Sequence, residues 1–456
     1  MNNPSTHTAA SETTKAKPMG LWTSASMGIG AMIGAGIFAL LGQVASLTGG
    51  YTPLLFITGA IISILTGYSY AKLGIRYPSS GGVAEYLVQG FKSKYVAGVL
   101  TVMFYLSIVI GMALVTRAFG TYAAAMTPAG ANSIWTPIFA SAIIVALTII
   151  NAVGAAAVSK SERYLVAIKV TLLLVFVVAG IALAKRSTIS SQGFTLNTTN
   201  VIHALALCLL AFQGFGVITN AIDDMPKPDR TLPRAIVAAI IVTAIVYIGV
   251  AYGTLLNLSV TEIIAARDYA LAEAAKPSFG SVGFTIVSIT ALLSAASCIN
   301  ASLYSSAKMT FMMATVRELP KAEMHWVWRG GSVGLFSTAA LVLIIAVGIN
   351  LERIATLASI VFLLIYASVH FGHLRLTCET GASRPLIAIA FAINAAIFIA
   401  FAVLTVAQSW FLSLAFAAIV ASSCIMELLV RRTNGPIRST IDPAKIQSPP
   451  AAATPA

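Results

Sequence analysis

Apolar runs of about 20 residues recur along the whole of this chain, separated by short polar breaks. Such a run is long enough for a helix to cross a hydrocarbon core about 30 Å thick. Soluble domains are about one quarter charged, whereas only 9% of these 456 residues are charged. The sequence therefore predicts an all-α integral membrane protein with twelve transmembrane helices, at residues 20–47, 52–76, 94–126, 134–156, 162–185, 200–224, 233–257, 278–317, 331–350, 353–375, 385–406 and 408–430.

The basic residues predict an orientation. If alternate loops share a side, 21 of the 28 Lys and Arg residues lie on the side of the N-terminus, six lie on the other side, and Lys169 lies within a span. Cytoplasmic loops carry such an excess, so we expect both termini in the cytoplasm of a multi-pass protein of the cell membrane. Basic residues beside a bilayer face anionic lipid, so the formal charge of +13 requires no nucleic acid partner.

Neither the ends of the chain nor its cysteines indicate a catalytic or metal-binding site. Residues 1–18 are polar and residues 433–456 are rich in Pro and Ala, so we expect two disordered cytoplasmic tails. The four cysteines lack the spacing of a metal site, and we expect no metal and no cofactor. The longest connection on the outer side, residues 258–277, has helical spacing and predicts one surface helix.

Glycine interrupts two of the predicted spans. The first contains GIGAMIGAGIF, from Gly28 to Phe38, and the sixth contains LLAFQGFGVITNA, from Leu209 to Ala221. The sixth span lies five crossings after the first, so the two interruptions enter the membrane from opposite faces. Broken segments at corresponding positions of two halves indicate an inverted-repeat transporter with its binding site near the bilayer midplane.

These interruptions also divide the chain. Residues 19–432 would form one transporter domain, in which residues 20–186 and 199–376 are the two repeats. Residues 385–432 would add two peripheral helices.

Unwound backbone at membrane depth needs a partner for its polar groups, and a ligand can be that partner. The N–H groups of residues 34–37 would favour an anion, and the carbonyl groups of residues 210–213 would favour a cation. A solute with a carboxylate and an ammonium group on one carbon fits both. A second interpretation stays open, because Gly30 and Gly34 also have the spacing of small residues that let helices pack closely.

Three motifs in order resemble those of one superfamily. They are MIGAGIF in the first span, YAKLGIRYPSSGGVAEYL from Tyr70 to Leu87, and DDMPKPDRTLPRAI from Asp223 to Ile236. They resemble motifs of the amino acid/polyamine/organocation transporter superfamily, and AFQGFGVITNA and SAASCINASLYSSAKM look closest to its proton-coupled, broad-specificity amino acid permeases of the ApcT type. The resemblance covers nearly the whole chain. It implies a LeuT-like five-plus-five inverted repeat with broken helices 1 and 6, plus two peripheral helices.

The resemblance also implies a substrate site on the backbone of the two interruptions. The N–H groups of residues 35–37 would bind a carboxylate, and the carbonyls of Met32, Leu210 and Gln213 would bind an amine. The residues of this implied site are Met32, Ala35, Gly36, Ile37, Leu210, Ala211, Phe212, Gln213 and Phe215.

The implied site departs from its relatives at two positions. Many relatives carry Phe or Trp at the position of Leu210 as a gate over the substrate. The gate here is therefore aliphatic, or it is supplied by Phe212 or Phe215. Many relatives carry Ser at the position of Ala35, so here backbone donors alone would hold the carboxylate.

The energy source is predicted to be a gradient, because the chain contains no GxxxxGK[ST] phosphate loop. Lys169 is the clearest ionisable residue within an apolar run, and such residues usually mark a function. It lies about five residues from the end of its span, so its stem could also reach the interface, and the residues alone leave both roles open. The resemblance implies that Lys169 carries the coupling proton in a site where structural relatives bind sodium, beside Ser294, Ser297 and the carbonyls of residues 28–31.

His370 and His373 are weaker candidates, one turn apart near the inner end of the tenth span. They could relay protons, or they could be packing or solvated residues at the interface.

We therefore expect a secondary active transporter, and not an enzyme, that imports amino acids by proton symport through alternating access. An amino acid or amine exchanger without net proton coupling is an alternative, and its transport would survive the loss of Lys169. A non-transporting amino acid sensor would bind the solute without moving it. The lack of charge deep in the implied pocket favours small or apolar neutral substrates.

Overall fold

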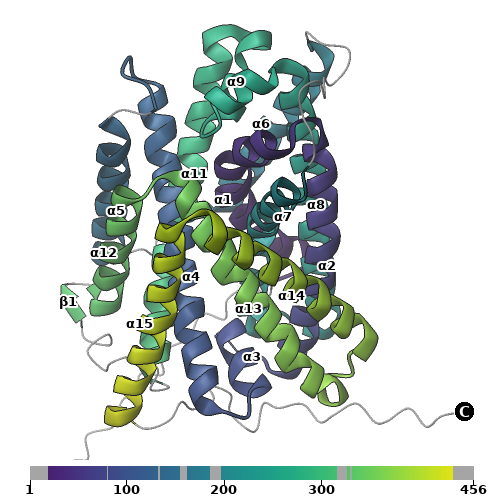
Figure 1. Cartoon of the computed structure of the whole chain (residues 1–456), viewed down its shortest axis with the longest axis vertical. Helices are drawn as coiled ribbons and strands as arrows, with labels where there is room; N and C mark the ends of the chain where they lie inside the picture. The colour runs from purple at the N-terminus through teal and green to yellow at the C-terminus, as the bar shows by residue number, and fades with distance from the viewer. Residues whose placement is uncertain are drawn as a thin grey trace, which may run out of the picture.

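The computed structural model describes residues 19–79, 81–131, 134–154, 162–184, 197–315, 326–328 and 331–434, and these residues are almost wholly helical (Figure 1). The elements are α1 (Leu21–Thr48), the 3₁₀ turn η1 (Gly49–Tyr51), α2 (Thr52–Arg76), α3 (Val83–Gly90), α4 (Lys94–Ala125), α5 (Trp135–Gly154), α6 (Glu162–Ala182), α7 (Thr198–Phe212), the 3₁₀ helix η2 (Gln213–Asp224), α8 (Pro228–Asn257), α9 (Val260–Ala265), α10 (Ala270–Glu273), α11 (Lys276–Thr315), β1 (Trp326–Trp328), β2 (Gly331–Ser332), α12 (Val333–Gly348), α13 (Leu351–Thr380), α14 (Arg384–Gln408) and α15 (Trp410–Asn434).

Each predicted span coincides with a long helical segment, the sixth being α7 and η2 together. In the described part of the chain, nine segments are long and apolar enough to cross a membrane. One of them, Gly36–Arg76, joins the second half of α1 to α2. Val166–Ala182 and Val333–Gly348 are shorter apolar helices. The prediction of an all-helical integral membrane protein is confirmed at this level.

The long helices run between two ends of the bundle (Figure 1). We name these ends by the short helices that cover them, the α9 face and the α3 face. The chain enters α1 at the α3 face, where the N–H of Met19 donates to the carbonyl of Asp224 at 2.9 Å. The end of α15 lies at the same end of the bundle as α3 (Figure 1).

Helix boundaries follow local capping chemistry. The side chains of Ser93, Asn197, Ser332 and Asn350 each accept a hydrogen bond from the backbone N–H three residues on, at the starts of α4, α7, α12 and α13. Such caps satisfy N–H groups that have no partner within the helix. These polar residues thus fix where the chain turns back into the bundle.

The centre of the bundle is α1, whose Met32, Ile33 and Ile37 are fully buried. The periphery is α14 and α15, where only 22% and 17% of the most apolar window is buried, against 78% in α4 and α13. Apolar side chains that stay exposed in a helix of this length must face lipid. Figure 1 shows α14 crossing the front of the bundle obliquely, with α15 beside α4.

One prediction about a connection was wrong, and one feature of another connection was missed. Residues 258–277 do not form one surface helix, because α9 and α10 are separated by a turn at residues 266–269, and Ala270, Leu271 and Ala272 are buried. A short antiparallel pair, β1 with β2, was not predicted. The turn between α9 and α10 packs on α1, which is distant in sequence, and helical periodicity does not report such a contact. β1 and β2 are close in sequence, but strands of three and two residues are too short to show a strand pattern.

Candidate functional site

The two glycine-rich interruptions meet backbone to backbone inside the bundle. A Cβ atom on Gly214 of η2 would lie 2.6 Å from the nitrogen of Met32, and one on Gly36 would lie 2.7 Å from the carbonyl oxygen of Ala211. Real Cβ atoms essentially never approach that closely. Glycine is therefore required here because α1 and the α7–η2 junction leave no room for a side chain.

The second interruption is a change of helix type. α7 ends at Phe212, the N–H of Gln213 donates to the carbonyl of Leu210, and η2 continues as a 3₁₀ helix for 12 residues. Runs of 3₁₀ helix this long are uncommon and often mark a functional hinge. The sequence located this irregularity but not its form.

The first interruption is not visible as a break, because α1 is helical from Leu21 to Thr48. Its glycines also serve close packing, the second interpretation left open by the sequence. A Cβ on Gly30 would lie 2.6 Å from Cγ2 of Val166 in α6, and one on Gly34 would lie 2.8 Å from Cβ of Cys298 in α11. Two helices, α6 and α11, therefore pack closely on this part of α1.

Side-chain hydroxyls reach two carbonyl groups of α1 at this point. The hydroxyl of Tyr247 in α8 donates to the carbonyl of Met32 at 2.6 Å and lies 3.3 Å from that of Ala211. Oγ of Ser294 in α11 donates to the carbonyl of Ile33 at 3.4 Å. In an intact helix these carbonyls pair with the N–H groups of Gly36 and Ile37. The hydroxyls thus offer the carbonyls an alternative donor.

The structure brings most of the implied substrate residues together. Met32 and Ile37 on α1, and Leu210, Ala211, Phe212 and Phe215 on α7 and η2, are all buried, and Gln213 is half-buried. The side chain of Ala35 lies outside the described residues. Of the two candidate gate residues, Phe212 packs against Tyr247 with ring centroids 5.2 Å apart, and Phe215 packs against Tyr70 at 5.4 Å.

Lys169 is buried, with 3% of its surface exposed. It lies one helical turn after Val166, whose side chain fills the space beside Gly30 of α1, so it falls on the same side of α6 as that contact. Ser294 is fully buried and Ser297 is half-buried on α11. The three residues of the implied proton site thus belong to the helices that pack on α1 beside its glycines.

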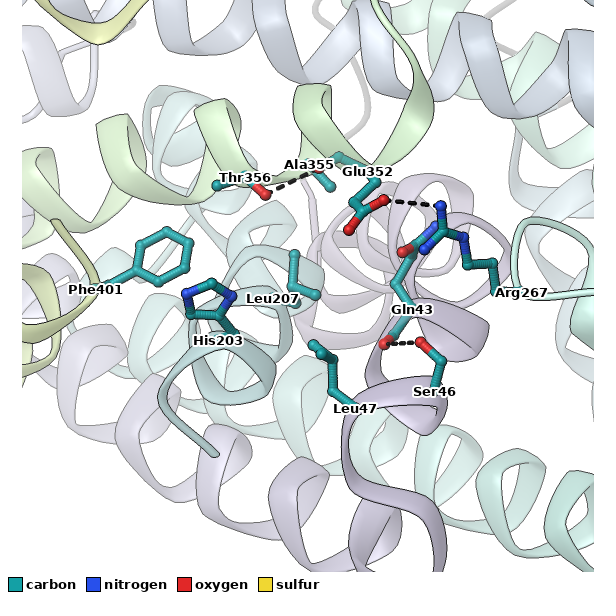
Figure 2. Close-up of a pocket in the computed structure, with 10 residues that line it drawn as sticks. All are labelled: Gln43, Ser46, Leu47, His203, Leu207, Arg267, Glu352, Ala355, Thr356 and Phe401. Atoms are coloured by element: carbon teal, nitrogen blue, oxygen red, sulfur yellow. Dashed lines mark hydrogen bonds and ion pairs between the residues drawn. The ribbon is translucent and has the colours of Figure 1, made fainter. Parts of the chain in front are cut away.

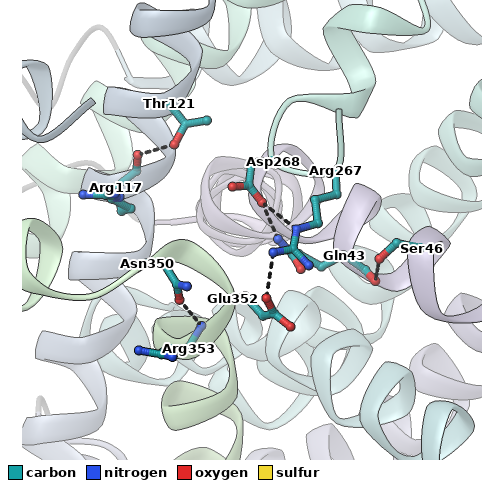
Figure 3. A network of polar contacts seen from close by, with 9 residues as sticks. All are labelled: Gln43, Ser46, Arg117, Thr121, Arg267, Asp268, Asn350, Glu352 and Arg353. Carbon is teal, nitrogen blue, oxygen red and sulfur yellow. Dashed lines mark hydrogen bonds and ion pairs between the residues drawn. The ribbon is translucent and has the colours of Figure 1, made fainter. Parts of the chain in front are cut away.

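At the α9 face, four polar residues join three elements (Figure 3). Nε2 of Gln43 in α1 donates to Oδ1 of Asp268 at 2.5 Å, and the guanidinium of Arg267 pairs with Glu352 of α13 at 2.8 Å. We call Gln43, Arg267, Asp268 and Glu352 the α9-face network. A Cβ on the neighbouring Gly42 would collide with the carbonyl of Arg267, so the turn between α9 and α10 lies directly on α1.

Asp268 has an unusual environment for a carboxylate. Burial raises its pKa, and Glu352 adds to that effect, while Arg267, Arg117 and the hydrogen bond from Gln43 oppose it. The net direction is upward from the ordinary value of 3.8. Protons in the aqueous phase at this face can therefore affect the network.

A cavity of about 70 Å³ lies beside this network, between α1, α7, α13 and α14 (Figure 2). Its wall includes Gln43, Arg267 and Glu352, together with His203 and Phe401, whose rings stack edge to face at 5.0 Å. The apolar side chain of Leu207 also lines this pocket (Figure 2). The network and its pocket were missed by the sequence analysis, and a polar Gln43 after Gly42 in an apolar run was the one signal available.

The two histidines of α13 are buried rather than solvated. Nδ1 of His373 bonds to the Ser69 hydroxyl at 2.7 Å, and Nε2 bonds to Thr380 at 2.9 Å. Because the Thr380 hydroxyl donates to carbonyls of its own helix, it accepts from Nε2–H. Neutral His373 is therefore the Nε2–H tautomer, and it ties α13 to α2.

Comparison with known proteins gives the family. A model of the amino acid permease family matches residues 19–427. The inner membrane transport protein YbaT of Escherichia coli is 36% identical over 372 residues, which cover 81% of this chain and 86% of the relative. An uncharacterized protein of Methanocaldococcus jannaschii is 34% identical, covering 84% of this chain and 88% of the relative. The serine/threonine exchanger SteT of Bacillus subtilis is 24% identical, covering 78% and 82%.

The matched range includes every element from α1 to most of α15, so the α1 and α7–η2 meeting point lies within the shared region. The family and its named relatives are transporters. The chain thus belongs to the amino acid permease family of the amino acid/polyamine/organocation superfamily, and it is a transporter and not an enzyme.

Proposed function

We propose that this protein is a secondary active transporter that imports amino acids by proton symport and alternating access. Its fold would be a LeuT-like five-plus-five inverted repeat of twelve crossings, with α14 and α15 outside the repeats. The observation that carries the proposal is the meeting of two glycine-rich turns, far apart in sequence, backbone to backbone in the buried centre of the bundle.

The substrate would bind at this meeting point by its α-carbon groups. If the α1 turn opens at residues 34–37, the N–H groups of Ala35, Gly36 and Ile37 become donors for a carboxylate at a helix N-terminus. The hydroxyls already placed at the carbonyls of Met32 and Ile33 lower the cost of that opening, because no carbonyl is left buried without a donor. An ammonium group would then face the carbonyls of residues 210–213 and of Met32.

Lys169 would carry the coupling proton. Its ammonium group would donate to oxygen atoms of α1 and α11, and loss of the proton would release those contacts. Because α1 also carries the substrate site, the affinity for protons and the affinity for substrate would be linked. Lys169 is buried inside the helix bundle, and an ionisable residue that is buried within a membrane span usually has a function because its burial is costly. Protonation from one side and deprotonation to the other would give the direction of net transport.

The substrate site would be closed by polar contacts toward the α9 face and by aromatic contacts toward the α3 face. At the α9 face, the α9-face network ties α1 to α13. Toward the α3 face, Tyr70 contacts Tyr86, Phe215 and Tyr366 edge to face, with centroids 5.4–6.0 Å apart. Alternating access would require one of these two layers to part at a time.

The α9 face would be extracellular and the α3 face cytoplasmic. Basic residues collect at the α3 face, including Lys72, Arg76, Arg375 and Arg384 at the ends of α2, α13 and α14. This excess favours a cytoplasmic location in a cell membrane.

Exchange without net proton coupling is the second candidate, and one observation favours it. The relative SteT is described as a serine/threonine exchanger. Exchange would use the same substrate site, and it would differ by needing substrate on both sides. It would not need Lys169 to lose its proton.

Uptake by proteoliposomes distinguishes the candidates. Labelled L-amino acids are offered under an inward proton gradient, under a sodium gradient, or with only internal amino acid, for wild type, Lys169→Ala and the control Lys276→Ala, whose cation lies at the α9 face. We expect concentrative uptake that follows the proton gradient and disappears only in Lys169→Ala. Uptake that requires internal substrate and persists in Lys169→Ala would identify an exchanger, and ligand binding without uptake would indicate a sensor.

A further inference from the structure

One side chain occupies the centre of the candidate site without having been predicted there. Tyr247 is fully buried on α8, and its ring lies between Phe56 and Phe212, with centroids at 5.4 and 5.2 Å. Two aromatic neighbours fix the ring, so the hydroxyl has a defined position. That position is the gap between α1 and the α7–η2 junction.

The hydroxyl and the adjacent glycine fit each other. A Cβ on Gly36 would lie 2.1 Å from the Tyr247 oxygen, 3.0 Å from Cζ and 2.7 Å from the Ala211 carbonyl oxygen. Any larger residue at position 36 would displace the hydroxyl. The absence of a side chain at Gly36 therefore lets the backbone of α1 pack directly against the Tyr247 hydroxyl and the carbonyl of Ala211.

Counting hydrogen-bonding groups shows what the hydroxyl can do. It has one hydrogen, which it gives to the carbonyl of Met32 at 2.6 Å, with Ala211 as the longer acceptor at 3.3 Å. Its oxygen also interacts with the backbone N–H of Ile37. A carbonyl oxygen has two lone pairs. Once the α1 turn opens and the N–H of Gly36 leaves the carbonyl of Met32, that carbonyl can accept from Tyr247 and also from a ligand.

We infer that Tyr247 is a positioning residue for the amine end of the substrate. It takes one lone pair of the Met32 carbonyl, holds that carbonyl against the α7–η2 junction, and leaves the second lone pair directed at the ammonium group. The inference rests on the proposed transport function and deepens it, because it assigns amine recognition to a carbonyl fixed by a side chain from a third helix.

This arrangement predicts that Tyr247 favours substrates with a free amine. A ligand without the amine gains nothing from the second lone pair of Met32. Removing the Tyr247 hydroxyl frees the carbonyl to turn away, so amine-bearing ligands lose affinity and amine-lacking ligands do not. A purely structural role would weaken both kinds of ligand alike.

The test compares Tyr247→Phe with Tyr252→Phe, a control on the same helix whose side chain is exposed. Counterflow in proteoliposomes at equal pH on both sides gives KM and Vmax for labelled L-alanine, L-serine and L-leucine. Displacement of the same label from purified protein gives the relative affinity of the matching acids without the amine, which are propionate, 3-hydroxypropionate and 4-methylpentanoate.

For Tyr247→Phe we expect KM to rise roughly five- to tenfold, the loss expected for one hydrogen bond of this kind, with Vmax within about twofold of wild type. The preference for amino acid over matching acid should fall by the same factor, and Tyr252→Phe should match wild type. An unchanged preference, or equal losses for both ligand classes, would overturn the inference. Failure of the proposed function looks different, because wild type itself would then move none of the three amino acids.

A second variant protects the test from misfolding of the first. Gly36→Ala should displace the hydroxyl and raise KM, and the double variant Gly36→Ala with Tyr247→Phe should be less impaired than the product of the two single effects predicts. Coupled residues deviate from additivity in this way. Fully multiplicative effects would show that Gly36 and the hydroxyl do not act together, and they would count against the assigned role.

Discussion

At the scale of single residues, the contact between the backbones of α1 and η2 decides which glycines can be replaced by a larger residue. Gly214 and Gly216 are two residues apart on η2, but a Cβ on Gly214 would meet backbone atoms of Ala31 and Met32 at 2.6–2.8 Å. A Cβ on Gly216 would meet only Cε1 of Tyr70 at 3.6 Å, an ordinary contact. The two glycines look alike in the sequence, and only the structure separates them.

We therefore expect Gly214→Ala to abolish most transport and Gly216→Ala to preserve it. The first change forces α1 and η2 apart, at a cost of about 1–3 kcal/mol for overpacking, and the second adds a methyl group where there is room. Initial uptake rates and thermal unfolding in detergent, measured for both variants, check this. Equal activity of the two variants would show that the contact between α1 and η2 has no role in transport.

The sequence predicted much of this site, and what it missed has a physical explanation. Residues 28–38 and 209–221 can be recognised in the sequence as glycine-rich interruptions of apolar runs, because glycine destabilises the interior of a helix. Tyr247 gave no signal, since a tyrosine in an apolar run is ordinary and its role depends on two distant segments. Asp268 was likewise assigned to a surface helix, because its partners Gln43 and Glu352 are far away in sequence.

At the scale of elements, the α9-face network is one contact that can open by moving α1, α13 or the turn between α9 and α10. Asp268 faces Gln43 from α1, Arg117 and Tyr122 from α4, Glu352 from α13, and Arg267 and Tyr269 from its own segment. Its pKa is raised in the closed network by burial. A raised carboxyl pKa means that the closed form binds a proton more tightly than an open, hydrated form does.

Closure at the α9 face should therefore weaken as pH rises. The contribution of protonated Asp268 is complete below its ordinary value of 3.8, and it is lost as pH rises through the raised value. Asp268→Asn should remove this dependence. The measurement is the labelling rate of Ser46→Cys, on the wall of the cavity, by a membrane-impermeant maleimide in a Cys378→Ser background. Because the thiolate is the reactive form, each rate is divided by the rate of the same thiol in unfolded protein at that pH. A normalised rate that does not increase with pH, or an increase that persists in Asp268→Asn, would contradict the assignment.

The same scale shows why helices were predicted more accurately than connections. An apolar run of about 20 residues in a membrane must satisfy its backbone internally, so its helical state is decided locally. The separation of α9 from α10 depends on a tertiary contact, because the turn between them lies on Gly42 of α1. The kink of α11 lies at Gly280, where φ is 62°. Ends of elements were predictable where a capping residue such as Ser93 or Asn350 stands.

At the scale of the whole molecule, the fold places the two faces in different chemical environments. Basic side chains at the ends of α2, α13 and α14 lie at the α3 face, together with the beginning of α1 and the end of α15. The α9 face instead carries a compact network in which Arg267 is paired with Glu352 and Asp268. A bilayer with an anionic cytoplasmic leaflet distinguishes these faces, and the basic one is stabilised on the cytoplasmic side.

The orientation can be read from two cysteines. Cys378 is exposed near the end of α13 at the α3 face, and Thr261 is exposed on α9 at the opposite face. With a membrane-impermeant maleimide, we expect Cys378 to react in inside-out vesicles and not in intact cells. Thr261→Cys in a Cys378→Ser background should react in intact cells. The reverse pattern would place the α9-face network on the cytoplasmic side. The protonation of Asp268 would then follow the internal rather than the external pH.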